Sequence, residues 1–82
     1  MADVASIIGP IIGPRCLVTG GCGYLGRALV AQLLELGCEV HTVDLAEAAP
    51  DPRVRHFRGD LRHYASIAPA FEGVHTVFHS AA

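Results

Sequence analysis

The stretch TGGCGYLG, residues 19–26, decides the fold of this chain. Two glycine patterns fit it: Gly21, Gly23 and Gly26 match G-x-G-x-x-G, while Gly20, Gly23 and Gly26 match G-x-x-G-x-x-G. In either pattern the first glycine allows a tight turn, the middle one lets the backbone approach a pyrophosphate, and the last allows a helix to pack close to a strand. A helix starting here would present free N–H groups to the phosphates.

The sequence on both sides of the glycines supplies the elements that such a loop requires. Residues 15–19 form a short apolar run, which predicts a buried strand. Residues 26–36 carry apolar side chains at helical spacing, which predicts an amphipathic helix that Gly37 ends. The glycines therefore lie between a predicted strand and a predicted helix, which is the context that gives the motif its meaning.

The remainder of the chain alternates strand and helix patterns in the same way. It predicts a strand at 39–44, a loop at 46–52, a strand at 54–58, a helix at 62–72 and a strand at 74–79. Pro69 falls inside the last helix and should kink it or divide it into two short pieces. This order predicts an α/β fold with a parallel sheet in spatial order 3-2-1-4, the first part of a doubly wound sheet.

Asp44 ends the second predicted strand, near the ~20-residue offset at which a carboxylate binds the ribose hydroxyls of a dinucleotide. Its charge would repel a 2′-phosphate, and the next residue is Leu45 rather than an arginine. NAD is therefore predicted over NADP. A P-loop is excluded because G-x-x-x-x-G-K-[ST] needs a lysine, and the chain has none.

Composition narrows the remaining classes of function. The 82 residues carry a formal net charge of −2, which provides no basic field for nucleic acid. Cys16, Cys22 and Cys38 are an odd number without C-x-x-C spacing, which favours reduced thiols in an intracellular protein. His75 and His79 lie on a predicted strand without chelating geometry, so we expect no metal site. No run approaches the ~20 apolar residues of a membrane span.

Three motifs resemble the extended short-chain dehydrogenases/reductases. TGGCGYLG resembles their T-G-G-x-G-[FY]-[LI]-G signature, GDLR at 59–62 resembles G-D-[LIV]-[RT], and VFHSAA at 77–82 resembles [VI]-[FI]-H-x-A-A. The resemblance implies an NAD(P)-binding Rossmann fold. Residues 15–82 would form an incomplete dinucleotide-binding domain, and residues 1–14, with their tandem IIGP, a flexible leader.

The resemblance also implies roles for single residues. Asp60 would contact the adenine amino group, Leu61 would pack on the adenine ring, and the backbone at Ala81 would lie against the cofactor. The complete predicted cofactor-binding set is Gly20, Gly23, Tyr24, Leu25, Gly26, Asp44, Asp60, Leu61 and Ala81.

Within this family the chain is most similar to the 3β-hydroxysteroid dehydrogenase group, above all to the decarboxylating sterol-4α-carboxylate 3-dehydrogenases. Residues 18–23, 52–61 and 71–79 carry the likeness. It implies hydride transfer at a sterol 3-hydroxyl in steroid biosynthesis, in the cytoplasm or peripheral to the endoplasmic reticulum. Two alternatives stay open: a fragment of a nucleotide-sugar epimerase, which shares the glycine loop, and a non-catalytic dinucleotide-binding module.

The chain departs from this family in its catalytic residues. The family uses a tyrosine whose pKa is lowered by a lysine four places on, in the pattern Y-x-x-x-K. Tyr24 and Tyr64 are the only tyrosines, and neither precedes a lysine. We therefore assign no catalytic residue, interpret the chain as an N-terminal fragment, and expect weak or no NAD binding and no turnover from it alone.

Overall fold

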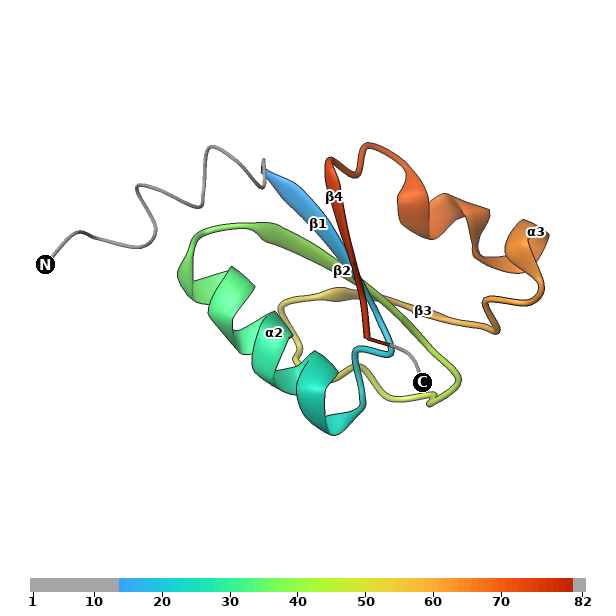
Figure 1. Cartoon of the computed structure of the whole chain (residues 1–82), viewed down its shortest axis with the longest axis horizontal. Helices are drawn as coiled ribbons and strands as arrows, with labels where there is room; N and C mark the ends of the chain where they lie inside the picture. Colours follow the sequence, from blue (N-terminus) through green and yellow to red (C-terminus); the bar gives the residue numbers. More distant parts are fainter. Residues whose placement is uncertain (1–13, 81–82) are drawn as a thin grey trace, which may run out of the picture.

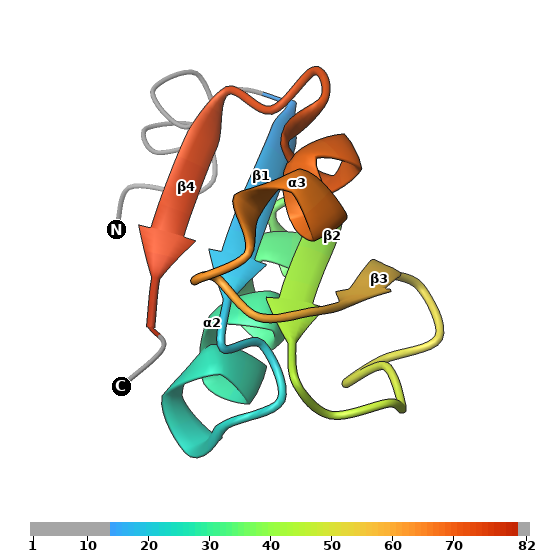
Figure 2. The same cartoon turned by 90° about the vertical axis from the view of Figure 1, so that its right-hand side faces the viewer.

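The computed structural model describes residues 14–80, which form one four-stranded parallel sheet between helices. The strands are β1 (Arg15–Thr19), β2 (Glu39–Asp44), β3 (Arg55–Arg58) and β4 (Thr76–His79). Their spatial order is β3-β2-β1-β4, which confirms the predicted order (Figure 1). Each pair of neighbouring strands is parallel, so that their carboxyl ends share one edge of the sheet; Figure 2 shows the arrows of β1, β2 and β4 pointing the same way.

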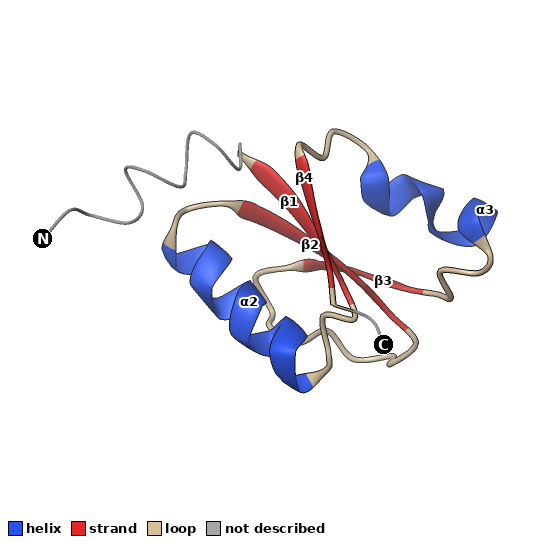
Figure 3. Cartoon of the chain, in the orientation of Figure 1, coloured by secondary structure: helices blue, strands red, loops and turns tan. Residues whose placement is uncertain are grey.

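The three central residues of strand β1, Cys16, Leu17 and Val18, are all apolar because both faces of the strand are covered. Cys16 and Val18 face α2 (Tyr24–Glu35), whereas Leu17 packs with Ile67 on the opposite face. Figure 3 shows α2 on one side of the sheet and α3 (Tyr64–Ile67) on the other. Burial on both faces explains why this strand lacks the polar alternation of a half-exposed one.

Helix α2 begins at Tyr24, two residues before the predicted start at Gly26. Its first two side chains point into solvent, so they carry no amphipathic signal. The helix ends at Glu35, one residue before the predicted end at Leu36, and Gly37 stops it as predicted. Gly37 has a φ of +84°, and its N–H donates to Leu34 O at 3.0 Å while Cys38 N–H donates to Leu33 O at 3.0 Å. These two bonds are the pair that defines a Schellman cap.

The helix predicted over 62–72 is divided into α3 and the 3₁₀-helix η1 (Ala68–Phe71). Pro69 lies in the first turn of η1, where its missing N–H is tolerated. His41, buried on β2, fixes η1 to the sheet through its Nδ1, which lies 2.9 Å from Ala70 O. The division that Pro69 predicted is therefore present.

Three predicted elements begin too early in the sequence. Strand β3 begins at Arg55 rather than at residue 54, β4 begins at Thr76 rather than at residue 74, and the 62–72 segment becomes helical only at Tyr64. A turn explains the last difference, because His63 N–H donates to Asp60 O at 2.9 Å. The predicted leader at 1–14 lies outside the described residues except for its last position.

Candidate functional site

The glycine loop joins the carboxyl end of β1 to the start of α2. Gly20 has a φ of +70°, a conformation that L side chains rarely adopt, and its N–H donates to Val43 O at 2.8 Å. At Gly26 a Cβ atom would lie 2.0 Å from Gly20 O, so only glycine allows the helix to start this close to the loop. These two positions set the path of the loop.

The structure shows which of the two glycine patterns lines the cleft. Gly20, Gly23 and Gly26 line a cleft beside the loop, whereas Gly21 is absent from its lining. A Cβ atom at Gly21 would lie 2.8 Å from Thr42 Cγ2, so this glycine is needed for packing on β2. The G-x-x-G-x-x-G pattern is the one that faces the cleft.

The start of α2 presents unused backbone donors to this cleft. The first helical bond runs from Arg27 N–H to Gly23 O at 2.9 Å, so the N–H groups of Tyr24, Leu25 and Gly26 have no acceptor within the helix. Gly23 caps the helix without a side chain, and no acidic residue occupies the first turn. Such a helix start carries a partial positive charge that suits a phosphate.

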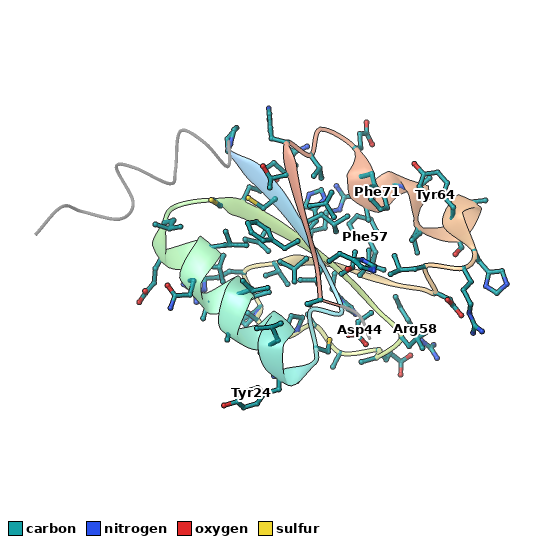
Figure 4. The ribbon with its side chains drawn as sticks, viewed as in Figure 1. Tyr24, Asp44, Phe57, Arg58, Tyr64 and Phe71 are labelled. Atoms are coloured by element: carbon teal, nitrogen blue, oxygen red, sulfur yellow. The ribbon has the colours of Figure 1, made fainter. Side chains whose placement is uncertain are left out.

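Asp44 lies at the carboxyl end of β2, on the rim of the same cleft. Its Oδ2 accepts a hydrogen bond from Cys22 N–H at 3.1 Å, and its Oδ1 accepts one from Ala46 N–H at 2.8 Å. The carboxylate is therefore oriented by the glycine loop on one side and by its own turn on the other. Figure 4 shows it close to Arg58, its register partner on β3.

Asp60 follows β3 and is held by the next arginine along the chain. Its Oδ2 lies 2.6 Å from Arg62 Nη2, and its Oδ1 accepts from Arg62 N–H at 2.9 Å. These hydrogen bonds lower the pKa of the Asp60 carboxyl to about 2 and raise the pKa of Arg62. Asp60 thus lines the cleft as an ionised carboxylate that is already paired with Arg62.

The cleft measures about 710 Å³ and lies where the strands end. Its lining is Gly20, Gly23, Tyr24, Leu25, Gly26, Val43, Asp44, Leu45, Gly59, Asp60, Leu61, Arg62 and Ser80. The structure therefore brings together eight of the nine residues predicted to bind cofactor. The ninth, Ala81, lies outside the described residues.

Sequence reasoning missed five lining residues: Val43, Leu45, Gly59, Arg62 and Ser80. Each directly neighbours a predicted residue at the end of a strand, so the rule that ligands bind at the carboxyl ends of parallel strands could have found them. Ser80 also has a structural role, because its hydroxyl donates to Thr19 O and fastens the end of β4 to β1.

The two tyrosines have different surroundings. Tyr24 is 97% exposed and lines the cleft, whereas the ring of Tyr64 packs against Phe71 with 5.5 Å between centroids (Figure 4). The ring of Tyr64 therefore makes a packing contact. Within residues 14–80, no three His, Cys, Asp or Glu side chains come together as a metal site would need. None of the helices described is long and apolar enough to cross a membrane.

The donor set fits a dinucleotide. The helix start offers N–H groups for phosphates, the strand ends offer carboxylates for hydroxyl and amino groups, and Leu25, Leu45 and Leu61 offer apolar surface. At Gly23 a Cβ atom would contact only Gly20 O, at 3.4 Å, so the remaining space around it belongs to the cleft. A side chain at this position would take up part of that space.

Comparisons with known proteins agree with this geometry. The model of the NAD dependent epimerase/dehydratase family matches residues 16–82. A sterol-4-alpha-carboxylate 3-dehydrogenase, decarboxylating, from Bos taurus is 48% identical over 67 residues, which are 82% of this chain and 19% of that protein. A 3-beta-hydroxysteroid dehydrogenase from Mycolicibacterium neoaurum is 40% identical over 70 residues, 83% of this chain and 19% of that protein.

Among solved structures, a UDP-glucose 4-epimerase superposes with a TM-score of 0.74 at 31% identity, covering 83% of this chain and 22% of the epimerase. The chain thus spans about a fifth of the length of these relatives. The parallel sheet, the position of the glycine loop and the family match confirm the resemblance and the Rossmann fold. The chain belongs to the NAD-dependent epimerase/dehydratase family, within the extended short-chain dehydrogenases/reductases.

Proposed function

We propose that residues 15–82 are the dinucleotide-binding part of an oxidoreductase of the 3β-hydroxysteroid dehydrogenase group, with residues 1–14 as a leader. The observation that carries the proposal is the cleft at the carboxyl ends of the strands. A single cleft collects the start of α2, the Asp44 carboxylate and the Asp60–Leu61 pair. Parallel α/β sheets bind dinucleotides at this edge.

Each predicted residue has a role in this proposal. The N–H groups of the α2 start would hold the pyrophosphate, while Gly20, Gly23 and Gly26 leave it space. Asp44 would accept hydrogen bonds from the adenosine ribose. Asp60 and Leu61 would contact the adenine, and the backbone at Ala81 the rest of the cofactor. When bound, the nicotinamide of the cofactor supplies the hydride-carrying carbon of the reaction.

NAD is the proposed cofactor because of the charge on Asp44. If the adenosine ribose lies at Asp44, the 2′-phosphate of NADP would lie close to this carboxylate. Both oxygens of the carboxylate accept hydrogen bonds from backbone N–H groups, which fix their position. Repulsion between two anions at short range disfavours NADP, whereas the hydroxyl of NAD can donate to the same oxygens.

A sterol with a 3-hydroxyl is the proposed substrate of the longer family proteins, by similarity to the bovine sterol dehydrogenase. A nucleotide sugar is the second candidate, because 83% of this chain superposes on a UDP-glucose 4-epimerase with a TM-score of 0.74. Neither Tyr24 nor Tyr64 precedes a lysine, so we assign the catalytic step to no residue of this chain.

Titration of the ¹⁵N-labelled chain with NAD, followed by NMR, tests the proposal and tolerates weak binding. We expect millimolar affinity, with the largest shifts in the amides of residues 20–26 and at Asp44. Asp44→Ala should weaken binding several-fold. Asp51→Ala is the matched control, because Asp51 Oδ1 accepts from Arg53 N–H at 2.8 Å in the same kind of turn, away from the cleft.

Two results would change the proposal. If saturating NAD leaves the amides of residues 20–26 unshifted while the chain is folded, the cleft is not a dinucleotide site. Micromolar affinity together with cooperative unfolding would favour a non-catalytic binding module. Incubation with NAD and a 3β-hydroxysteroid should yield no NADH, and measurable turnover would contradict the absence of a catalytic residue.

A further inference from the structure

His56 contacts the turn after Asp44 without lining the cleft itself. It is half-buried on β3 and is the register partner of Thr42 on the neighbouring strand β2. Its Nδ1 lies 2.7 Å from Thr42 Oγ1, and its Nε2 lies 2.8 Å from Ala46 O. Both nitrogens of the ring are therefore engaged, one with the sheet and the other with the turn.

The partners of the His56 ring fix the direction of both hydrogen bonds. Ala46 O is a carbonyl oxygen and can only accept, so Nε2 carries the proton and donates to it. In the neutral ring Nδ1 is then an acceptor, and the hydroxyl of Thr42 donates to it. A side chain that replaces His56 must therefore supply a donor to Ala46 O, or this hydrogen bond is lost.

The hydrogen bond to Ala46 links His56 to Asp44 along one path. Ala46 N–H donates to Asp44 Oδ1 at 2.8 Å, while Ala46 O accepts from His56 Nε2 at 2.8 Å. Both backbone polar groups of Ala46 are thus engaged, one by the carboxylate and one by the histidine. Because His56 holds the carbonyl of Ala46, it fixes the direction from which the N–H of Ala46 meets Asp44.

The hydrogen bond from Thr42 links His56 to Asp44 along a second path. Thr42 is fully buried, and a Cβ atom at Gly21 would lie only 2.8 Å from its Cγ2. Because the hydroxyl of Thr42 is held by His56, its methyl group stays against Gly21. The next residue, Cys22, donates its N–H to Asp44 Oδ2 at 3.1 Å. His56 thus contacts, directly or through Thr42, both backbone segments that orient Asp44.

We propose that His56 is a positioning residue for the dinucleotide, because it holds Asp44 in the orientation that receives the adenosine ribose. The proposal rests on the proposed function, since it requires the ribose to lie at Asp44. A carboxylate whose two oxygens are already fixed loses less conformational freedom when the ribose hydroxyls donate to it, so binding is tighter. His56 itself touches no atom of the ligand in this proposal.

The test measures dissociation constants of NAD by NMR titration of the ¹⁵N-labelled chain and of variants whose folding is checked by circular dichroism. His56→Leu should weaken NAD about two- to fivefold, as the loss of one hydrogen bond predicts. His56→Gln should recover most of this loss, because its amide group can donate to Ala46 O. His41→Leu is the matched control and should leave NAD affinity unchanged. His41 also holds a loop carbonyl, with its Nδ1 2.9 Å from Ala70 O, but it does so on the η1 side of the sheet.

A double-mutant cycle with Asp44→Ala shows whether His56 acts through the carboxylate. In the Asp44→Ala chain, His56→Leu should weaken NAD no further, because the group that it positions has been removed. A general effect of His56 on the fold would instead give the same fold-change with and without the Asp44 carboxylate.

The outcomes separate this inference from the proposed function. If NAD does not bind the unaltered folded chain, both fail. If NAD binds and His56→Leu leaves its affinity unchanged, or weakens it by the same factor in the Asp44→Ala chain, the inference is overturned and the proposed function stands. An equal loss of affinity in His41→Leu, or no recovery in His56→Gln, would also overturn the inference, because the bond to Ala46 O would then not be the cause.

Discussion

Replacing Gly26 with alanine tests whether the close approach of helix and loop keeps the cleft in shape. The new Cβ would lie 2.0 Å from Gly20 O and 2.8 Å from Gly21 Cα, where ordinary contact begins at 3.4 Å. The obstructing atoms are backbone, so the loop or the start of α2 would have to move by well over an ångström. Both parts of the cleft would shift with that movement.

The expected change in the free energy of unfolding follows from two opposing effects. Alanine is favoured over glycine inside a helix by about 1 kcal/mol. Overpacking of this kind costs about 3 kcal/mol at the upper end of its usual range. We therefore expect Gly26→Ala to lower the free energy of unfolding by about 2 kcal/mol. A chain of this size has only ~4–12 kcal/mol in all, so the loss is large enough to measure.

Urea unfolding followed by circular dichroism measures the stability, and NAD titration reports on the cleft. Gly37→Ala is the control, because Gly37 has a φ of +84° and a Cβ atom added there would meet nothing within 4 Å. Gly37→Ala should cost about 1–2 kcal/mol through backbone strain alone and leave NAD binding intact. If Gly26→Ala were as stable as the unaltered chain and bound NAD normally, the argument from close approach would be refuted.

Two further predictions concern titratable groups. Hydrogen bonds from Arg62 hold the pKa of Asp60 at about 2, below its ordinary value, so the stability they give is present near neutral pH and is lost as the pH falls from about 4 towards 2. Arg62→Gln should return the NMR-measured pKa of Asp60 towards 4, and an unchanged value would contradict the assignment. Burial raises the pKa of the Cys16 thiol to about 12, while burial and then the Asp44 charge raise that of Cys22. In the folded chain at pH 8 a thiol reagent should therefore react slowly with half-buried Cys22. It should react with buried Cys16 only after unfolding in urea. Fast reaction of Cys16 without urea would contradict this expectation and show that β1 opens.

The sequence predicted those parts of the fold that local patterns encode. The bounds of β1 and β2 were predicted correctly, because the runs at 15–19 and 39–44 are closed by Gly20 and by the turn after Asp44. The predicted start of α2 was wrong, because the first turn of the helix faces solvent and shows no apolar periodicity. The eight cleft residues were predictable from motif spacing and strand ends.

Arg58 could not be predicted in the same way, because its position depends on how β3 aligns with β2. A shift of β3 by one residue would turn Arg58 to the other face of the sheet. The observed register pairs Asp44 with Arg58 and is supported by Thr42, whose hydroxyl lies 2.7 Å from His56 Nδ1. The position of Arg58 beside Asp44 therefore depends on tertiary register, which local sequence patterns do not encode.

The charges around the cleft explain why an anionic ligand suits it although the chain carries a net charge of −2. Part of the negative charge of its two carboxylates is already compensated, on Asp60 by Arg62 and on Asp44 by two backbone N–H groups. The first N–H groups of α2 have no acceptor within the helix, and the two carboxylates keep unused acceptor sites. A ligand that satisfies both must bring an anionic acceptor to the helix start and hydroxyl donors to a carboxylate, as the pyrophosphate and the ribose of a dinucleotide do. The preference for such a ligand thus comes from which charges remain uncompensated, and net charge alone would have suggested the opposite.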